Sequence, residues 1–293
     1  HVPATSANCC VGFDCLGMAV DWWAHFTFEE SDELIVEGCP EEFKGSNNLV
    51  VQAFYTACDY LRLDYPTFKL TIDTDIPFAR GLGSSSTCVV AGILACDAWF
   101  KKNMDQLEIL KIATSIEGHP DNVAPAILGG FVMASQEDDG SIVYRKLDWP
   151  QDWDITVCIP DFELSTNIAR SVLPEQIPMQ DAIFNAKHLA MLVEAVNTKD
   201  TKLMKIALQD KLHQPYREKL VPGMREIMEA FKHEDGVLGC VLSGAGPTML
   251  IISHKYDVDK IKSTVREIWE GQSIKTDIRT LKIEPKGAEI LEA

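Results

Sequence analysis

The sequence predicts an α+β protein with two domains, and three observations support this fold class. A chain of 293 residues is long for a single hydrophobic core, so one large domain or two ordinary ones are expected, and we choose two. Segments with strand periodicity are mixed with segments of helix periodicity. The stretch DWPQDW at residues 148–153 is acidic, aperiodic and interrupted by proline, so we expect domains over residues 1–150 and 151–293.

The elements of the first domain follow from periodicity and helix caps. Phe68, Leu70 and Ile72 alternate with polar residues, which predicts a strand. Asp105 and Glu108 have the spacing of a capping box. In order, we expect strands up to about residue 35, a helix over 48–61, a strand over 68–73, a helix over 85–99, a helix from 105 that Gly118 ends, a short helix to 126 that Asp121 can cap, and strands over 131–134 and 141–147.

The second domain shows strands and helices in mixed order, with no internal repeat. We expect the helices to pack on one face of the strands. In order, the expected elements are a strand over 155–159, a long helical region over 181–212, a helix near 224–232, strands over 237–242 and 248–252, a helix over 258–269 and a strand over 277–283.

Composition and charge argue against several classes of protein. The net charge is -17, with 44 acidic against 27 basic residues, and nucleic-acid affinity needs a cationic surface. The longest apolar stretch, residues 88–96, is far shorter than the ~20 residues of a membrane span, and no secretion signal is expected. Nine cysteines without framework spacing predict reduced core residues of a cytoplasmic protein, and without a Cys-x-x-Cys pair zinc is not expected.

A loop rich in glycine and serine, GLGSSS at residues 81–86, follows the strand at 68–73 and opens a helix. Glycine adopts positive φ readily, and the free N–H groups of a helix N-terminus attract anions, so this order of parts predicts a phosphate site. It is not a Walker A loop, because no lysine precedes the serines, and Ser86 replaces the third glycine of a dinucleotide fingerprint. A tight turn with serine caps is the alternative interpretation of the loop alone.

Three further motifs accompany the loop: VPATSAN at residues 2–8 followed by GFD at 12–14, EGHPDNVAP at 117–125, and LSGAGPT at 242–248. In this order and at these distances they resemble the small-molecule kinases of the GHMP superfamily, and within it most the homoserine kinases. The resemblance covers essentially the whole chain. It implies a two-domain GHMP kinase fold, with an amino-terminal domain similar to domain 2 of ribosomal protein S5 and a ferredoxin-like carboxyl-terminal domain.

The resemblance also implies an activity, the phosphorylation of the side-chain hydroxyl of L-homoserine to O-phospho-L-homoserine, a step of threonine biosynthesis. ATP and Mg²⁺ are the implied cofactors. Phosphoryl transfer needs a phosphate site, a divalent cation and a nucleophile held in line. The implied nucleotide-binding residues are Arg80, Gly81, Leu82, Gly83, Ser84, Ser85 and Ser86, although each serine could instead be an N-cap, as we favour for Ser86.

Ser85 and Glu117 are the implied metal-binding residues. Glu117 lies in the last turn of its helix, where the macrodipole disfavours an anion by ~0.3–1 kcal/mol, so a nearby cation would offset that cost. A solvated surface glutamate is the alternative. Asp121 is either a general base or a positioning residue, with the γ-phosphate taking the hydroxyl proton. Sister families pair such an aspartate with a lysine, but Thr5 stands at that place here.

A zwitterionic amino acid needs an anion for its ammonium group and a fork of donors for its carboxylate. We expect Asp14 to bind the ammonium group and Arg170 with Arg217 to bind the carboxylate, although lone arginines are usually solvated. His119 either lines this pocket or makes a structural hydrogen bond. The implied catalytic residues are Asn8, Thr166 and Asp121, and the implied substrate-binding residues are Asn8, Asp14, His119, Asn122, Arg170, Arg217 and Gly244.

Two other classes of function remain open from the sequence. The chain could be another GHMP kinase, such as mevalonate kinase. Against this, the charges of Asp14, Arg170 and Arg217 suit an amino acid. The chain could also be a non-catalytic nucleotide-binding relative or an RNA-binding protein, and its negative charge argues against RNA. The expected partners are therefore L-homoserine and ATP, with no nucleic acid and no membrane, and a homodimer is left open.

Overall fold

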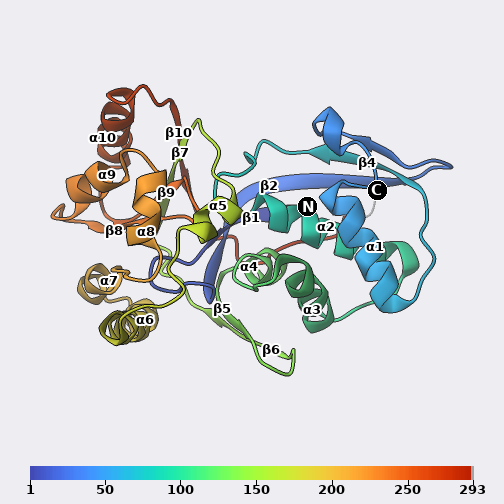
Figure 1. The fold of residues 1–293 in the computed structure, drawn as a ribbon, viewed down its shortest axis with the longest axis horizontal. Coiled ribbons are helices and arrows are strands. Elements are labelled where there is room, and N and C mark those ends of the chain that lie inside the picture. Colours follow the sequence, from blue (N-terminus) through green and yellow to red (C-terminus); the bar gives the residue numbers. More distant parts are fainter. Residues whose placement is uncertain (292–293) are drawn as a thin grey trace.

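The computed structural model describes residues 1–291 as two β-sheets with helices packed against them (Figure 1). The first sheet has the strand order β3-β4-β2-β5-β6, with β1 paired to β2. Its elements are β1 (Val2–Ala7), β2 (Leu16–Glu30), β3 (Ile35–Glu37), η1 (Glu41–Phe43), α1 (Leu49–Leu61), β4 (Phe68–Asp73), α2 (Ser84–Phe100), α3 (Gln106–Glu117), α4 (Val123–Leu128), β5 (Phe131–Gln136) and β6 (Ile142–Leu147). Apolar side chains of α1 to α4 pack on the sheet and form the core of this half.

Local signals in the sequence place most of these boundaries correctly. The capping box of Asp105 and Glu108 begins α3, and Gly118 ends it with φ of 86°. The prediction that Asp121 caps the next helix is wrong. The N-cap residue of α4 is Asn122, whose Oδ1 accepts from the hydroxyl of Thr5 and makes no capping bond. The carboxylate of Asp121 instead accepts a hydrogen bond from His119.

The second sheet has the strand order β10-β7-β9-β8 with every neighbouring pair antiparallel. This order, with helices after the first and third strands, is the ferredoxin-like arrangement that the resemblance implies. Its elements are β7 (Trp153–Pro160), α5 (Thr166–Ser171), α6 (Met179–Thr198), α7 (Thr201–Ala207), α8 (Gln214–Arg217), η2 (Glu218–Leu220), α9 (Met224–Phe231), β8 (Val237–Leu242), β9 (Met249–His254), α10 (Val258–Glu270) and β10 (Thr276–Leu281).

Helices cover both faces of the second sheet, so the expectation of a single covered face is wrong. Ile155 and Val157 of β7 belong to a core shared with α6, α7 and the first half of the chain. Cys158, on the opposite face, packs with α9 and α10. β7, β8 and β9 are therefore buried on both sides, which explains why they are mainly apolar, whereas β10 at the edge is partly polar and exposed.

The long helical region predicted over residues 181–212 is two helices. Lys199 adopts a left-handed conformation, with φ of 56°, and ends α6. The side chain of Asp200 then accepts hydrogen bonds from the N–H groups of Lys202 and Leu203 and begins α7. Within residues 1–291 no helix combines the length and the apolar character that crossing a membrane requires.

The chain crosses from the first sheet to the second between β6 and β7, in the stretch where we predict the domain boundary. The boundary itself remains a prediction. Residues 282–291 return to the first half, where Val20 and Ile283 form a β-bridge and the N–H of Ala288 donates to the carbonyl of Ala126 (2.8 Å). The last described residues consequently lie beside the amino-terminal half (Figure 1).

Candidate active site

A cleft of about 1110 Å³ lies between the two halves of the molecule. The N-terminus of α2, the C-terminus of α3, α5, α8 and the turn between β8 and β9 all contribute to it. A second groove, beside Trp149 and Trp153, contains none of the predicted site residues. The cleft contains most of them: Asn8, Asp14, Gly81, Gly83, Ser84, Ser85, Ser86, Glu117, His119, Asp121, Asn122, Thr166, Arg170, Arg217 and Gly244.

Two predicted nucleotide-binding residues, Arg80 and Leu82, are not among the residues that line the cleft. The Nε of Arg80 donates to the carbonyl of Pro160 (3.1 Å), so this side chain reaches towards the second sheet. Leu82 is 1% exposed and belongs to the shared core. Its carbonyl accepts a hydrogen bond from the N–H of Thr5 (3.1 Å), which ties the loop to β1.

The glycine-rich loop has the conformation that an anion site requires. Gly81 and Gly83 have φ of 76° and 67°, in the left-handed region that glycine adopts without strain. Gly83 is the N-cap of α2 and has no side chain, so the first N–H groups of the helix receive no capping bond from it. A Cβ on Gly81 would lie 2.2 Å from the carbonyl oxygen of Ser243, so the loop also packs closely on the turn after β8.

Ser85 and Glu117 lie together beside this loop. The hydroxyl of Ser85 donates to Oε1 of Glu117 (2.5 Å). Burial raises the pKa of the Glu117 carboxyl above its usual range, the bond from Ser85 and the nearby His119 oppose this shift, and the nearby Asp121 adds to it. Within residues 1–291 no lysine, arginine or histidine forms an ion pair with Glu117. A partly buried carboxylate without an ion-pair partner, beside a hydroxyl and the glycine-rich loop, fits a divalent metal ion.

Asp121 and His119 form a second close pair. Asp121 is 2% exposed, and its Oδ1 lies 2.5 Å from Nδ1 of His119. This hydrogen bond raises the pKa of His119. Thr5 stands where sister families have a lysine, and its hydroxyl donates to Oδ1 of Asn122 (2.8 Å) rather than to Asp121. No lysine forms an ion pair with Asp121 in the described part of the chain. The carboxylate of Asp121 therefore has an imidazole, and not an ammonium group, as its partner.

Asp14 and Arg170, predicted to bind opposite charges of one substrate, contact each other. Nη2 of Arg170 donates to Oδ1 of Asp14 (2.7 Å) and Nη1 donates to Oδ2 (3.1 Å). Arg170 lies on the short helix α5, which Ser165 caps through the N–H of Ile168. The side chains of the pair are 36% and 35% exposed, so both charges remain accessible from the cleft. Thr166 lies one turn before Arg170 on the same helix.

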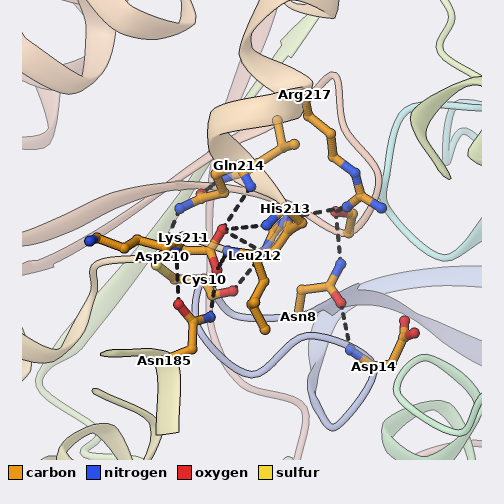
Figure 2. Close-up of polar contacts among 12 residues, drawn as sticks. Asn8, Cys10, Asp14, Asn185, Asp210, Lys211, Leu212, His213, Gln214 and Arg217 are labelled. Carbon is orange, nitrogen blue, oxygen red and sulfur yellow. Dashed lines mark hydrogen bonds and ion pairs between the residues drawn. The ribbon is translucent and has the colours of Figure 1, made fainter. Parts of the chain in front are cut away.

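Arg217 is almost fully buried, with an exposed fraction of 1%. Its Nε donates to the carbonyl of Ala169 (3.1 Å) and its Nη1 to the carbonyl of Gly244 (3.1 Å). Asn8 donates to the same carbonyl of Gly244 (2.9 Å). Figure 2 shows the bond that Asn8 accepts from the N–H of Asp14. The turn at Gly244 thus joins the amino-terminal motif to Arg217.

Sequence reasoning missed several residues of the site. An apolar part of the cleft contains Cys39, Phe43, Leu49, Ile72 and Phe78, and nothing in their local pattern distinguishes them from ordinary core or surface residues. His213 and Asp210, which support Arg217, were also missed. The signal for Asp210 was present, since its side chain caps the turn that starts α8.

Comparisons with known proteins agree with this architecture. The models for the GHMP kinases N terminal domain and for the GHMP kinases C terminal match residues 48–130 and 192–271. Homoserine kinase of Clostridium botulinum is 41% identical over 288 residues, which is 98% of this chain and 96% of that protein. Homoserine kinase of a Synechococcus species is 39% identical over 295 residues, which is 99% of this chain and 96% of that protein.

Solved structures show the same similarity. Homoserine kinase from Cytophaga hutchinsonii has a TM-score of 0.88 and 29% identity, covering 98% of this chain and 94% of that one. Phosphomevalonate kinase of Streptococcus pneumoniae, at 14% identity and a TM-score of 0.69 over 95% of this chain and 98% of that one, shares the fold. The GHMP fold expected from the motifs is thereby confirmed, and the chain belongs to the homoserine kinases of the GHMP kinase family.

Proposed function

We propose that this protein transfers the γ-phosphoryl group of ATP to the side-chain hydroxyl of L-homoserine, which yields O-phospho-L-homoserine and ADP. One observation carries the proposal: a single cleft holds a phosphate loop at the start of α2 and, beside it, one carboxylate and two guanidinium groups from Asp14, Arg170 and Arg217. These charges suit an amino acid. The homoserine kinases to which the chain is similar along its whole length support the same substrate.

The nucleotide is expected to bind along the glycine-rich loop. The free N–H groups at the start of α2 donate to phosphate oxygens, and the helix dipole adds to this attraction. The apolar part of the cleft near Phe43, Leu49 and Phe78 suits the nucleobase. Such local binding is needed because the protein as a whole carries a charge of -17 and repels polyanions.

Mg²⁺ fits the pair formed by Ser85 and Glu117, because the Glu117 carboxylate is desolvated and lacks a cationic partner in the described residues. When bound there, Mg²⁺ would neutralise charge on the transferred phosphate. The hydrogen bond from Ser85 orients the carboxylate before any metal binds. The chain therefore supplies one anionic and one neutral oxygen ligand.

The substrate is expected to place its ammonium group on Asp14 and its carboxylate on Arg170 and Arg217, with Asn8 and Thr166 orienting its hydroxyl. The hydroxyl oxygen forms a bond to the γ-phosphorus while the bond from that phosphorus to the bridging oxygen breaks, and ADP leaves. The hydroxyl proton passes to an oxygen of the transferred phosphate. We assign Asp121 a positioning role, since its carboxylate is already bonded to His119.

An ADP-release assay with a panel of hydroxyl substrates tests the proposal. L-Homoserine should stimulate ADP release strongly, and ³¹P NMR should show one new phosphate monoester. Mevalonate, which lacks an ammonium group, and galactose, which lacks both charges, should be poor substrates. The proposal fails if mevalonate or galactose is phosphorylated faster than L-homoserine, or if ADP release does not depend on L-homoserine. A homodimer and a cytoplasmic location remain predictions, which size-exclusion chromatography and cell fractionation would test.

A further inference from the structure

A fully buried histidine, His213, lies between the turn at Cys10 and the guanidinium group of Arg217 (Figure 2). Its Nε2 is 2.7 Å from the carbonyl oxygen of Cys10, and its Nδ1 is 3.2 Å from Nη1 of Arg217. Phe13 stacks on the ring, with 5.0 Å between centroids and 22° between planes. The ring is thus fixed at both nitrogens and on one face.

The two partners determine where the proton of His213 lies. A carbonyl oxygen only accepts, so the Nε2 that contacts Cys10 must carry the proton. A guanidinium group only donates, so the Nδ1 that contacts Arg217 must present its lone pair. Burial and the charge of Arg217 lower the pKa of His213, although Asp210 opposes this, and the neutral ring is the form that satisfies both contacts.

Asp210 fixes the backbone that carries His213. Its Oδ2 accepts from the N–H groups of His213 (2.9 Å) and Gln214 (2.7 Å), and its Oδ1 accepts from the N–H of Leu212 (2.9 Å) and Nδ2 of Asn185 on α6 (2.7 Å). The distance from Oδ2 to Nε2 of His213 is 3.6 Å, too long for a hydrogen bond. The carboxylate therefore holds the turn and does not take the ring proton.

The donors of Arg217 explain what His213 does for the site. A guanidinium group has five N–H donors. Three are used by the carbonyls of Ala169 and Gly244 and by Nδ1 of His213, and the two on Nη2 make no hydrogen bond within residues 1–291. Arg217 forms no ion pair there either, and burial lowers its pKa to about 10, so the cation still needs an anion.

We propose that His213, as the neutral ring with its proton on Nε2, positions Arg217 so that the two donors of Nη2 face the carboxylate of the substrate. The inference rests on the proposed function. By accepting the second proton of Nη1, His213 prevents the guanidinium group from rotating. By donating to Cys10, it ties Arg217 to the amino-terminal motif that carries Asp14.

Two substitutions separate the two bonds of the ring. Glutamine places its amide near the position of Nε2, so His213→Gln keeps a donor for Cys10 but loses the acceptor for Arg217. Asparagine places its amide near Nδ1, so His213→Asn keeps an acceptor for Arg217 but loses the bond to Cys10. His188 also bonds a carbonyl, that of Phe184, but lies outside the cleft, so His188→Gln is the matched control.

Kinetics should distinguish positioning from general damage. His213→Gln should raise KM for L-homoserine about tenfold or more, the scale of a lost hydrogen bond to a charged group, with KM for ATP within about twofold of native. His213→Asn should stay within about threefold, and His188→Gln should match the native protein. An analogue in which a hydroxymethyl group replaces the carboxylate should inhibit the native protein and His213→Gln equally. An unchanged KM for L-homoserine in His213→Gln, or equal losses for ATP and for the analogue, would overturn the proposal.

NMR of the native protein labelled with ¹⁵N-histidine tests the tautomer, and His213→Asn serves only to assign the signal, so the measurement remains decisive if His213→Gln fails to fold. The signal absent from His213→Asn should belong to a neutral ring protonated at Nε2 at pH 7. A proton on Nδ1 or a charged ring at that pH would overturn the proposal. If the native protein does not phosphorylate L-homoserine, the proposed function fails while the NMR result still stands.

Discussion

Gly83→Ala tests the phosphate loop, because the structure gives both reasons why a side chain is excluded there. Gly83 has φ of 67°, and a Cβ at this position would lie 1.9 Å from Oγ1 and 3.1 Å from Cβ of Thr5. Close-packed interiors do not contain such contacts, so the loop and β1 would have to separate by about 1 Å or more. The separation would weaken two hydrogen bonds, from the N–H of Thr5 to Leu82 (3.1 Å) and from its hydroxyl to Asn122 (2.8 Å).

The magnitude follows from these terms. A left-handed conformation costs an alanine about 1–2 kcal/mol, and each weakened hydrogen bond adds about 0.5–1.5 kcal/mol, so Gly83→Ala should lose about 2–5 kcal/mol of unfolding free energy. That is less than the whole stability of most domains, so the variant should fold. Its displaced loop should bind a non-hydrolysable ATP analogue at least about tenfold more weakly, measured by titration calorimetry, because phosphate contacts depend on loop position.

Gly140→Ala is the matched control, since Gly140 has φ of 79° but nothing within 4 Å of its Cβ position. It should lose only the backbone cost, about 1–2 kcal/mol, and should bind the nucleotide normally. Adding Thr5→Ala to Gly83→Ala removes the atom at 1.9 Å and should restore part of the affinity. The explanation is refuted if Gly83→Ala costs no more than Gly140→Ala and binds the nucleotide as tightly as the native protein.

Four further substitutions test the assigned charges. Glu117→Gln should reduce turnover by orders of magnitude but should not lower the melting temperature at pH 7 without metal. The pKa of Glu117 is raised in the folded protein, so the fold loses stability as pH rises through that pKa and the carboxyl ionises. Glutamine cannot ionise, so the variant avoids this loss. Mg²⁺ should raise the melting temperature of the native protein only, and equal rises would refute the metal assignment. Arg217→Ala should cost ~2–5 kcal/mol in kcat/KM for L-homoserine, more than Arg170→Ala, because Arg217 is more deeply buried. An equal loss in kcat/KM for ATP would count against the carboxylate assignment. Asp14→Asn should reduce homoserine turnover more than basal ATP hydrolysis, measured in the same ADP-release assay, and parallel losses would contradict the ammonium assignment.

The sequence predicted those parts of the site whose causes are local. The positive φ of Gly83, the capping box at Asp105 and the helix end at Gly118 depend on neighbouring residues, so they could be inferred from spacing. The break after Lys199 was also local, because Asp200 is a good N-cap, but the apolar periodicity on both sides concealed it. The assignment of Asp121 as a cap failed because a tertiary neighbour, His119, competes for its carboxylate.

Contacts between distant segments could not be predicted from spacing. Arg170 meets Asp14 across 156 positions, and His213 meets Cys10 across 203. Both depend on how the second sheet packs against the first, which is set by the apolar core that the two halves share. Motif resemblance supplied the proposed residues of the substrate site, but it gave no indication that two of them, Asp14 and Arg170, contact each other.

That pairing gives a physical reason for choosing a zwitterion. Under the assignments proposed above, the substrate must separate Asp14 from Arg170, and its ammonium group and carboxylate then replace the two lost partners. The carboxylate also supplies the anion that the buried Arg217 lacks, so every charge ends with a partner. The carboxylate of a hydroxy acid such as mevalonate would pair with Arg170 but leave Asp14 unpaired in a partly desolvated site. The ammonium group of an amino alcohol would pair with Asp14 but leave Arg170 unpaired. Leaving one charge without a partner costs more than a missing apolar contact, so selection acts on the two charges before the shape of the carbon chain matters.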